Sequence, residues 1–148
     1  MKSAQHPGQL VLLAYADGDD LEGAHDILRA RFAAFVASWG KRFAEVWAVD
    51  DRYPRTPDLS PEDSPAWNLG LNAVIPAEAT FTSFEPELDA LMAFLARLSL
   101  ESGHDFVVGY YDPARHLQED ITSVSASSDN TMLKAFVSVL LSERQSNA

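Results

Sequence analysis

The chain contains no cysteine among its 148 residues. Disulfide bonds and thiolate metal ligands are therefore excluded, and this composition is typical of proteins from a reducing compartment. A chain of this length needs no covalent staple, because it buries roughly 70% of the surface that its unfolded form exposes. Together with a hydrophobic content of 47%, the length predicts a single globular domain over residues 1–148.

Long apolar runs are also missing. The longest ones fall well short of the roughly 20 residues that a bilayer-spanning helix needs. The first apolar run opens on the polar Gln9 and is followed directly by acids, whereas a signal peptide ends in a small-residue cleavage site. We therefore expect no membrane segment and a cytoplasmic location.

Patterns that carry catalysis or nucleotide binding are absent from the sequence. The seven glycines are scattered and form neither a G-x-G-x-x-G nor a G-K-[ST] loop. No serine lies in a G-x-S-x-G turn. The sequence thus predicts no catalytic residue and no nucleotide cofactor. Glu45 is the best single acid–base candidate, because it interrupts an apolar run, although a glutamate on an open sheet face is simply solvated.

Metal-binding patterns are absent as well. The four histidines lie in no H-E-x-x-H or H-x-H arrangement, and the acids of residues 17–20 do not fit a calcium loop. Helix capping explains those acids better. His25 and Asp26 are expected on a solvated flank of the first helix. We predict no metal site; the histidines are His6, His25, His104 and His116.

Basic residues are scarce, with 11 Lys and Arg against 22 Asp and Glu and a net charge of −11. Direct binding to nucleic acid is disfavoured, because the electrostatic term that drives it would be repulsive. A cationic partner would instead be attracted, with its on-rate raised about 10- to 1000-fold at low salt. Acidity that serves solubility alone is the other interpretation.

Hydrophobic periodicity predicts eight elements. Helical spacing marks the helices, alternation marks a strand with one wet face at 67–75, and continuous apolar character marks strands covered on both faces. The expected strands are 9–16, 43–49, 67–75, 105–111 and 120–126, and the expected helices are 17–40, 83–103 and 127–144. Ser83 or Glu85 is expected to cap the second helix, and residues 145–148 to form a frayed tail.

The order β-α-β-β-α-β, followed by β-α, predicts an α+β fold of the ferredoxin-like (split βαβ) plait type, extended by a C-terminal strand and helix. The first and third strands would be central, with the two main helices on one face. The extra strand would lie beside the fourth, and the third helix over part of the second face. A three-layer, doubly wound α/β fold is the alternative.

The acidic, proline-rich segment 50–66 is the first candidate site. A hairpin connection usually has two to five residues, whereas this loop between strands two and three is far longer. Its four prolines reduce the entropy lost on docking, and its acids and flanking aromatics suit a basic protein partner. An insertion that is simply tolerated is the alternative. The residues predicted to bind are Asp50, Asp51, Tyr53, Asp58, Glu62, Asp63 and Trp67.

The second candidate lies at the end of the fourth strand, where Tyr110, Tyr111 and Asp112 follow one another. Tyrosine combines apolar area with a hydrogen-bonding tip. The alternative is that one tyrosine belongs to the core and the other caps the sheet edge.

Two hypotheses on function follow. The first is a non-enzymatic acidic protein that docks or neutralises a basic partner, such as a toxin or a nucleic-acid-acting enzyme, as immunity proteins, antitoxins and inhibitors do. The second is a small-ligand enzyme or sensor that uses the open sheet face around Glu45, Asn68 and Asn72. A polar cavity of about 300 Å³ or more on that face would favour the second. A homodimer through the edge of the second strand stays open.

Overall fold

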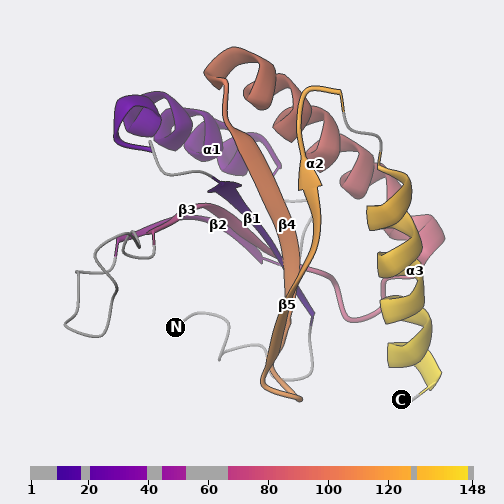
Figure 1. Ribbon diagram of the computed structural model, residues 1–148. Coiled ribbons are helices and arrows are strands. Elements are labelled where there is room, and N and C mark those ends of the chain that lie inside the picture. The colour runs from indigo at the N-terminus through magenta and orange to yellow at the C-terminus, as the bar shows by residue number, and fades with distance from the viewer. Residues whose placement is uncertain (1–9, 18–20, 40–44, 53–66, 128–129, 147–148) are drawn as a thin grey trace.

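The computed structural model describes residues 10–17, 21–39, 45–52, 67–127 and 130–146. The fold is mixed α+β, as predicted (Figure 1). The strands are β1 (Val11–Asp17), β2 (Glu45–Arg52), β3 (Trp67–Val74), β4 (Asp105–Asp112) and β5 (Leu117–Val124). The helices are the short 3₁₀ turn η2 (Glu22–Ala24), α1 (His25–Trp39), α2 (Phe81–Ser102) and α3 (Thr131–Ser146).

The five strands form one antiparallel sheet in the order β2-β3-β1-β4-β5. β1 lies at its centre, with Val11 opposite Val74 of β3 on one side and Tyr111 of β4 on the other. The predicted place of β5, beside β4, is confirmed. β2 is the first strand in this order and pairs with β3.

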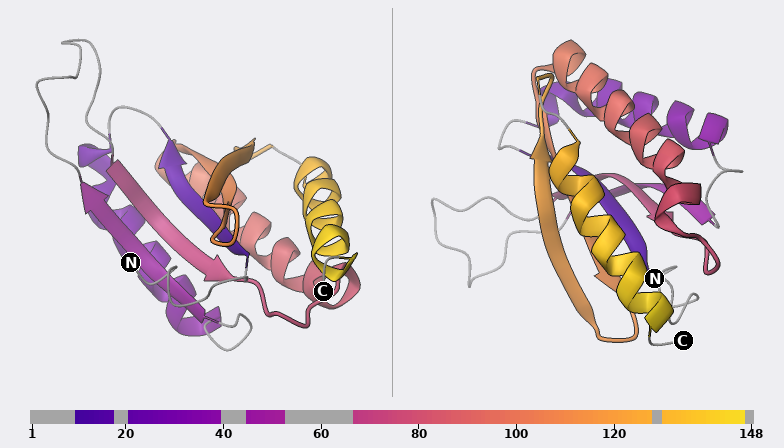
Figure 2. Two further views of the ribbon diagram at one scale, coloured as in Figure 1. Left: turned by 90° about the horizontal axis from the view of Figure 1, so that it is seen from below. Right: turned by 90° about the vertical axis from the view of Figure 1, so that its right-hand side faces the viewer.

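The three long helices lie on one side of the sheet (Figure 2). The prediction that the third helix covers the second face is wrong, because α3 packs on α2 and β5. Its buried Leu133 and Val137 belong to the same core cluster as Leu88 of α2. α3 lies on this side because β5 presents apolar side chains to the same core. They are Leu117, Ile121 and Val124.

The core between helices and sheet is aromatic at its middle. The ring of Phe32 packs in T-shaped geometry with those of Phe94 and Phe106, with centroids 5.4 and 5.8 Å away. Leu12 and Leu71 are fully buried on the helix side of their strands. Burial of each such side chain stabilises the fold by about 1.5–3 kcal/mol, so this face holds the helices in place.

The second face of the sheet is apolar, although a solvent-exposed face was predicted for β3. Asn72 is only 7% exposed, and its Oδ1 accepts a hydrogen bond from the Tyr15 hydroxyl at 2.6 Å. Its cross-strand neighbours, Leu13 and Trp47, explain the burial because they flank it on both sides. This part of the prediction is wrong.

The helix ends follow local capping rules. Thr80, rather than Ser83 or Glu85, is the N-cap of α2, and Ser83 completes a capping box with it. Gly103 ends α2 in the left-handed region, with φ at 75°, where glycine carries no steric cost. α3 extends to Ser146, so the predicted frayed tail is helical at residues 145 and 146. None of the helices in the described ranges is long and apolar enough to cross a membrane.

The end of β2 differs from the prediction in a way that matters for the site. Residues 50–52 were expected to begin the acidic loop, but β2 continues through them because Asp50 and Arg52 pair with Leu69 and Trp67 of β3. Residues 53–66, the remainder of the predicted loop, lie outside the described residues.

Candidate functional site

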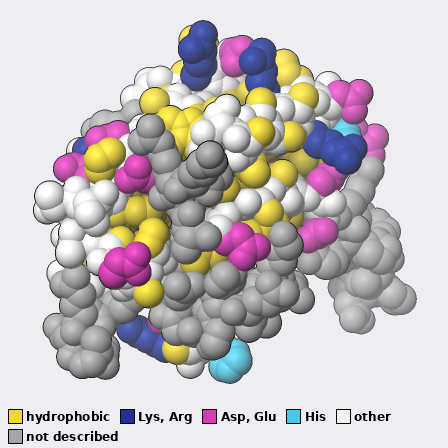
Figure 3. Space-filling model, turned by 180° about the vertical axis from the view of Figure 1, so that it is seen from behind, with side chains coloured by type: hydrophobic (Ala, Val, Ile, Leu, Met, Phe, Trp, Pro, Cys, Tyr) yellow, Lys and Arg dark blue, Asp and Glu magenta, His cyan; other side chains and the backbone are white. Residues whose placement is uncertain are grey.

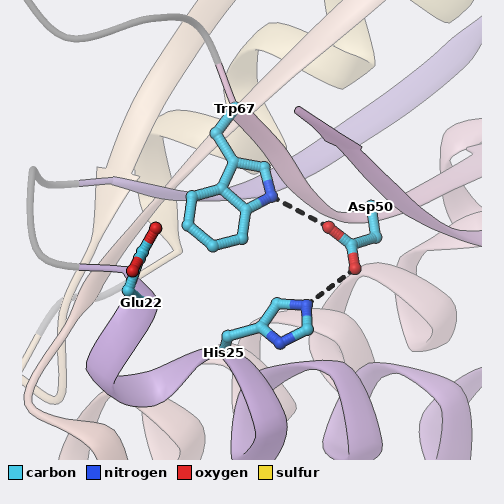
Figure 4. A pocket seen from close by; sticks show the side chains of 4 residues that line it. All are labelled: Glu22, His25, Asp50 and Trp67. Carbon is cyan, nitrogen blue, oxygen red and sulfur yellow. Dashed lines mark hydrogen bonds and ion pairs between the residues drawn. The ribbon is translucent and has the colours of Figure 1, made fainter. Parts of the chain in front are cut away.

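A cavity of about 350 Å³ lies where β2 ends, β3 begins and α1 starts. Four described side chains line it, one from η2, one from α1, one from β2 and one from β3 (Figure 4). They are Glu22, His25, Asp50 and Trp67. We call this the acidic pocket.

The strand register places Asp50 in this pocket. Alternate residues of a strand point to the same face. Val46 lies four residues before Asp50 in β2, and it packs against the core under the helices. Asp50 therefore shares the helix side of the sheet with Val46. Trp67 lies on that side as well, since it also packs against this core. The side chain of Asp50 consequently turns toward α1 instead of away from the fold.

The carboxylate of Asp50 joins three elements. His25, the first residue of α1, places its Nε2 2.8 Å from Asp50 Oδ2. The indole Nε1–H of Trp67 donates to the other oxygen, Oδ1, at 2.8 Å. The two rings lie 5.5 Å apart between centroids, tilted by 32°. Both oxygens are thus engaged, which fixes the start of α1 against the ends of β2 and β3.

The charges of this cluster reinforce each other. The hydrogen bond to Asp50 raises the pKa of His25 above its ordinary value of 6.5; partial burial opposes this shift, and Asp26, 3.2 Å from Nδ1, adds to it. For Asp50, burial favours the neutral form, but the hydrogen bonds from His25 and Trp67 outweigh it and lower the pKa. The pair is therefore favoured as imidazolium and carboxylate.

The hydrogen bonds of His25 involve both of its ring nitrogens. A general base needs a ring nitrogen within hydrogen-bond reach of the substrate. In His25 the Nε2 faces Asp50, and the Nδ1 faces Asp26, so both nitrogens are directed at carboxylates. Figure 4 shows the Nε2 side of the ring turned to Asp50. What the pocket offers a ligand is carboxylate charge beside an indole face.

Further acids lie at this end of the sheet. Asp17, at the end of β1, pairs across the strands with Asp105, at the start of β4. Asp51 follows Asp50 in β2, and Asp26 follows His25 with its side chain fully exposed. Like charges directly opposite each other on a sheet cost stability. The negative potential at this end is therefore a feature that the fold carries at some cost.

Two of the predicted binding residues, Asp50 and Trp67, come together in the pocket. Asp51 neighbours them on β2, opposite Asn68. The predicted residues of the loop itself lie outside the described residues: Tyr53, Asp58, Glu62 and Asp63.

Sequence reasoning missed Glu22 and His25. His25 was expected on a solvated flank, but it is bound to Asp50. A signal for this contact was present: extending the second strand by one residue places Asp50 on the same face as Val46 and Ala48, which is the face that α1 covers.

The second candidate lies at the far end of the sheet, because β4 runs antiparallel to β1. Tyr110 is buried, contacts the ring of Phe136 and donates to Glu119 at 3.4 Å. Tyr111 packs on the second face. Asp112 is buried and accepts from the Ala114 amide. These contacts within the chain account for all three residues structurally.

The residues predicted for the alternative site, on the open face of the sheet, do not line the acidic pocket. Asn72 is buried beneath Tyr15, and Glu45 is half-buried at the start of β2, opposite Val74.

Within the described residues, no group of three or more metal-ligating side chains is suited to hold an ion. Comparisons with protein-family models, with curated proteins and with solved structures found no match to this chain.

Proposed function

We propose that this protein is a non-enzymatic binding protein that docks or neutralises a basic protein, in the manner of immunity proteins, antitoxins and inhibitors. One observation carries the proposal: Glu22 and Asp50 converge with the indole of Trp67 on a single cavity, while both ring nitrogens of His25 face carboxylates. The cavity thus offers carboxylate charge and an aromatic face, and the ring nitrogens of His25 are directed at Asp26 and Asp50.

A basic side chain of the partner is the natural occupant. An arginine or lysine gains about 0.5–2 kcal/mol over the face of a tryptophan, and an arginine can also bond a carboxylate through two nitrogens. The net charge of −11 would steer such a partner toward the molecule. Acidic side chains are spread among hydrophobic ones on the face seen from behind (Figure 3), so the pocket, rather than overall charge, supplies specificity.

The protonation of His25 sets the pH dependence of this binding. Below its raised pKa the imidazolium offsets part of the charge of Asp26 and Asp50. As the pH rises through that pKa, His25 becomes neutral and the pocket gains net negative charge. Affinity for a basic partner is therefore expected to rise on the alkaline side.

A charge-reversal pair tests the proposal. The variant Glu22→Lys/Asp26→Lys reverses one exposed acid that lines the pocket and one that follows His25, and the control Glu78→Lys/Asp120→Lys reverses two exposed acids elsewhere, so both change net charge equally. Proteins captured from a lysate of the source organism at low and high salt are identified, and the dissociation constant of the purified partner is measured.

We expect a basic partner whose binding weakens with salt. The pocket variant should weaken it at least about tenfold, because reversed rim charges slow association and repel the partner. The control should bind like the parent protein. Equal losses in both variants, or partners that are not basic, would contradict the proposal.

Binding of a small ligand is the second candidate, favoured by the cavity's volume of about 350 Å³ and its converging polar groups, which fall in the range of ligand sites. A ligand screen observed through the Trp67 Nε1–H resonance separates the two. A tight small-molecule ligand that needs Asp50, together with no protein partner, would favour the second candidate.

The ferredoxin-like plait remains part of this proposal. In that fold the first and third strands are central, and both helices of the βαβ units lie on one face. The interior position of β1 and β3, the antiparallel pairing throughout and the helices on one side support the assignment. β5 and α3 would then be the extension. Many unrelated functions use this scaffold, so the fold does not choose among them.

A further inference from the structure

A second hollow adjoins the acidic pocket and shares Asp50 with it. This slot has a volume of about 250 Å³ and lies between α1 and the strands β2 and β3. Its lining is mostly apolar and includes Phe32 and Ala33 of α1, Ala48 of β2 and Leu69 of β3, with Arg29 and Asp50 as its charged residues.

Small side chains account for the slot. Arg29 and Ala33 are four residues apart and therefore lie on the same side of α1, where both are exposed. Ala48 of β2 is exposed as well. Two alanines on facing elements leave space beside the buried Phe32 and Leu69, which a larger side chain at either alanine would fill.

The two hollows follow each other along β2. Ala48 lines the slot, and Asp50, two residues further, borders both hollows. Residues two apart on a strand are separated by about 7 Å and point to the same face. An extended segment beside β2 presents its own alternate side chains at this same spacing.

The acidic pocket and the slot favour different kinds of side chain. The acidic pocket carries Glu22 and Asp50. The slot carries Arg29, whose charge acts on Asp50 and lowers its pKa. A cation is therefore favoured beside Glu22 in the pocket and disfavoured beside Arg29 in the slot, where an uncharged apolar side chain would be buried against Phe32 and Leu69.

From this spacing and charge pattern we propose that the groove between α1 and β2 binds an extended segment of the basic partner. An apolar side chain occupies the slot, and an arginine or lysine two residues away occupies the acidic pocket. This inference rests on the proposed function and specifies the partner's binding sequence: an apolar and a basic residue separated by one residue.

Synthetic peptides test the spacing directly. Acetylated, amidated peptides with Leu-Ser-Arg or Arg-Ser-Leu at the centre and serines around them are titrated into the full chain. An arginine-only peptide and a peptide with adjacent Leu-Arg serve as controls. Backbone amide and Trp67 Nε1–H resonances report where and how tightly each peptide binds.

We expect one of the two spaced peptides to bind about tenfold more tightly than both controls, which corresponds to about 1.4 kcal/mol. Its shifts should include Ala33, Ala48 and Trp67. Ala33→Leu fills the slot and should remove this tenfold gain while leaving binding of the arginine-only peptide unchanged. Ala34→Leu, on the adjacent exposed position of α1, is the matched control and should keep the gain.

The outcomes separate the two proposals. If the arginine-only peptide shifts Trp67 but the spaced peptides bind no more tightly, the groove inference is overturned and the proposed function stands. If no arginine peptide shifts Trp67, both fall. If Ala33→Leu and Ala34→Leu retain the same gain, the slot is not the binding site, and the inference is overturned even though the peptides bind.

Discussion

Replacing Asp50 with asparagine removes the charge that holds His25 and Trp67 together. The amide keeps an oxygen that can accept from the Trp67 indole, but it no longer stabilises the imidazolium. The carboxylate is the main cause of the raised pKa of His25. We therefore expect the pKa of His25 to fall in Asp50→Asn, toward the ordinary value of 6.5.

The loss of stability has a defined pH window. A histidine whose pKa is raised on folding contributes stability that is fully present below its unfolded pKa and is lost as the pH rises through the folded value. Asp50, whose pKa is lowered, contributes at any pH above its ordinary 3.8 and loses this contribution in acid. The pair is therefore strongest between about pH 4 and 6.5.

The size of the expected loss of stability follows from the solvent exposure of the His25 and Asp50 side chains. The side chains of His25 and Asp50 are 27% and 30% exposed, so solvent screens the pair, and its contribution should lie near the upper end of partly exposed pairs, about 1 kcal/mol. We expect Asp50→Asn to lower the free energy of unfolding by about 1 kcal/mol at pH 5.5 and by about half of that or less at pH 9. Total stabilities are only about 5–15 kcal/mol, so the change is measurable.

Urea unfolding at both pH values and an NMR titration of the His25 ring measure these effects. Asp51→Asn is the matched control, since it removes the same charge from the next residue of β2. A His25 pKa that stays the same in Asp50→Asn, or equal losses for the two variants at both pH values, would refute the role assigned to the ion pair.

Three further substitutions probe the fold by urea unfolding. Gly70→Ala would place a Cβ into the backbone carbonyl of Ala14, and we expect a loss of about 1–3 kcal/mol or a failure to fold. Thr80→Ala removes the N-cap of α2 and should cost about 1 kcal/mol. Tyr15→Phe leaves the buried Asn72 without its hydroxyl donor and should cost about 1–2 kcal/mol.

Each of these substitutions has a control, which for the first two lies on the same element and for Tyr15 lies on the neighbouring strand β4. Asn68→Ala, on β3 but only half-buried, should cost less than Gly70→Ala. Thr82→Ala, exposed in the first turn of α2, should leave stability within about 0.5 kcal/mol. For the tyrosine, the comparison is Tyr111→Phe, whose hydroxyl makes no hydrogen bond within the described ranges. Equal losses within a pair would contradict the contact assigned to it.

The elements of the fold were predictable because their periodicity is local. Leu88, Leu91 and Leu95 follow helical spacing, and Leu69 and Leu71 alternate along β3; all five are buried as the pattern indicates. The sequence order of these elements also predicted the α+β class and the place of β5. Neighbouring positions along the chain carry this information, so no tertiary contact had to be known.

The faces of the sheet were harder to predict. β1 and β4 are apolar on both sides, so their sequences do not say which side α3 covers. Leu117, Ile121 and Val124 of β5 decide this by packing against the helix side. Likewise, the sequence pattern predicts that Asn72 is solvent-exposed, and its burial becomes clear only from its contacts with Tyr15 and Trp47. Such burial depends on neighbours that are distant in sequence.

The candidate site was only half predictable. Asp50 and Trp67 stood out as an acid and an aromatic flanking the proline-rich segment, but charged residues are poor strand formers, so β2 appeared to end before Asp50. Pairing with Leu69 overrides that preference. The contact of His25 with Asp50 spans 25 residues. Alternation along β2 indicates that Asp50 faces α1, but which residue of α1 meets it depends on how the helix crosses the strand.

The central position of β1 has a consequence for how the protein is made. β1 leaves the ribosome before either of its neighbours because it precedes them in the sequence. Residue 11 must therefore wait for residue 74 on one side and residue 111 on the other. Sheets built from such distant pairings fold slowly, and an apolar strand with both edges open invites association with other chains. We therefore expect the nascent polypeptide to be most prone to aggregation through β1 until β4 has emerged.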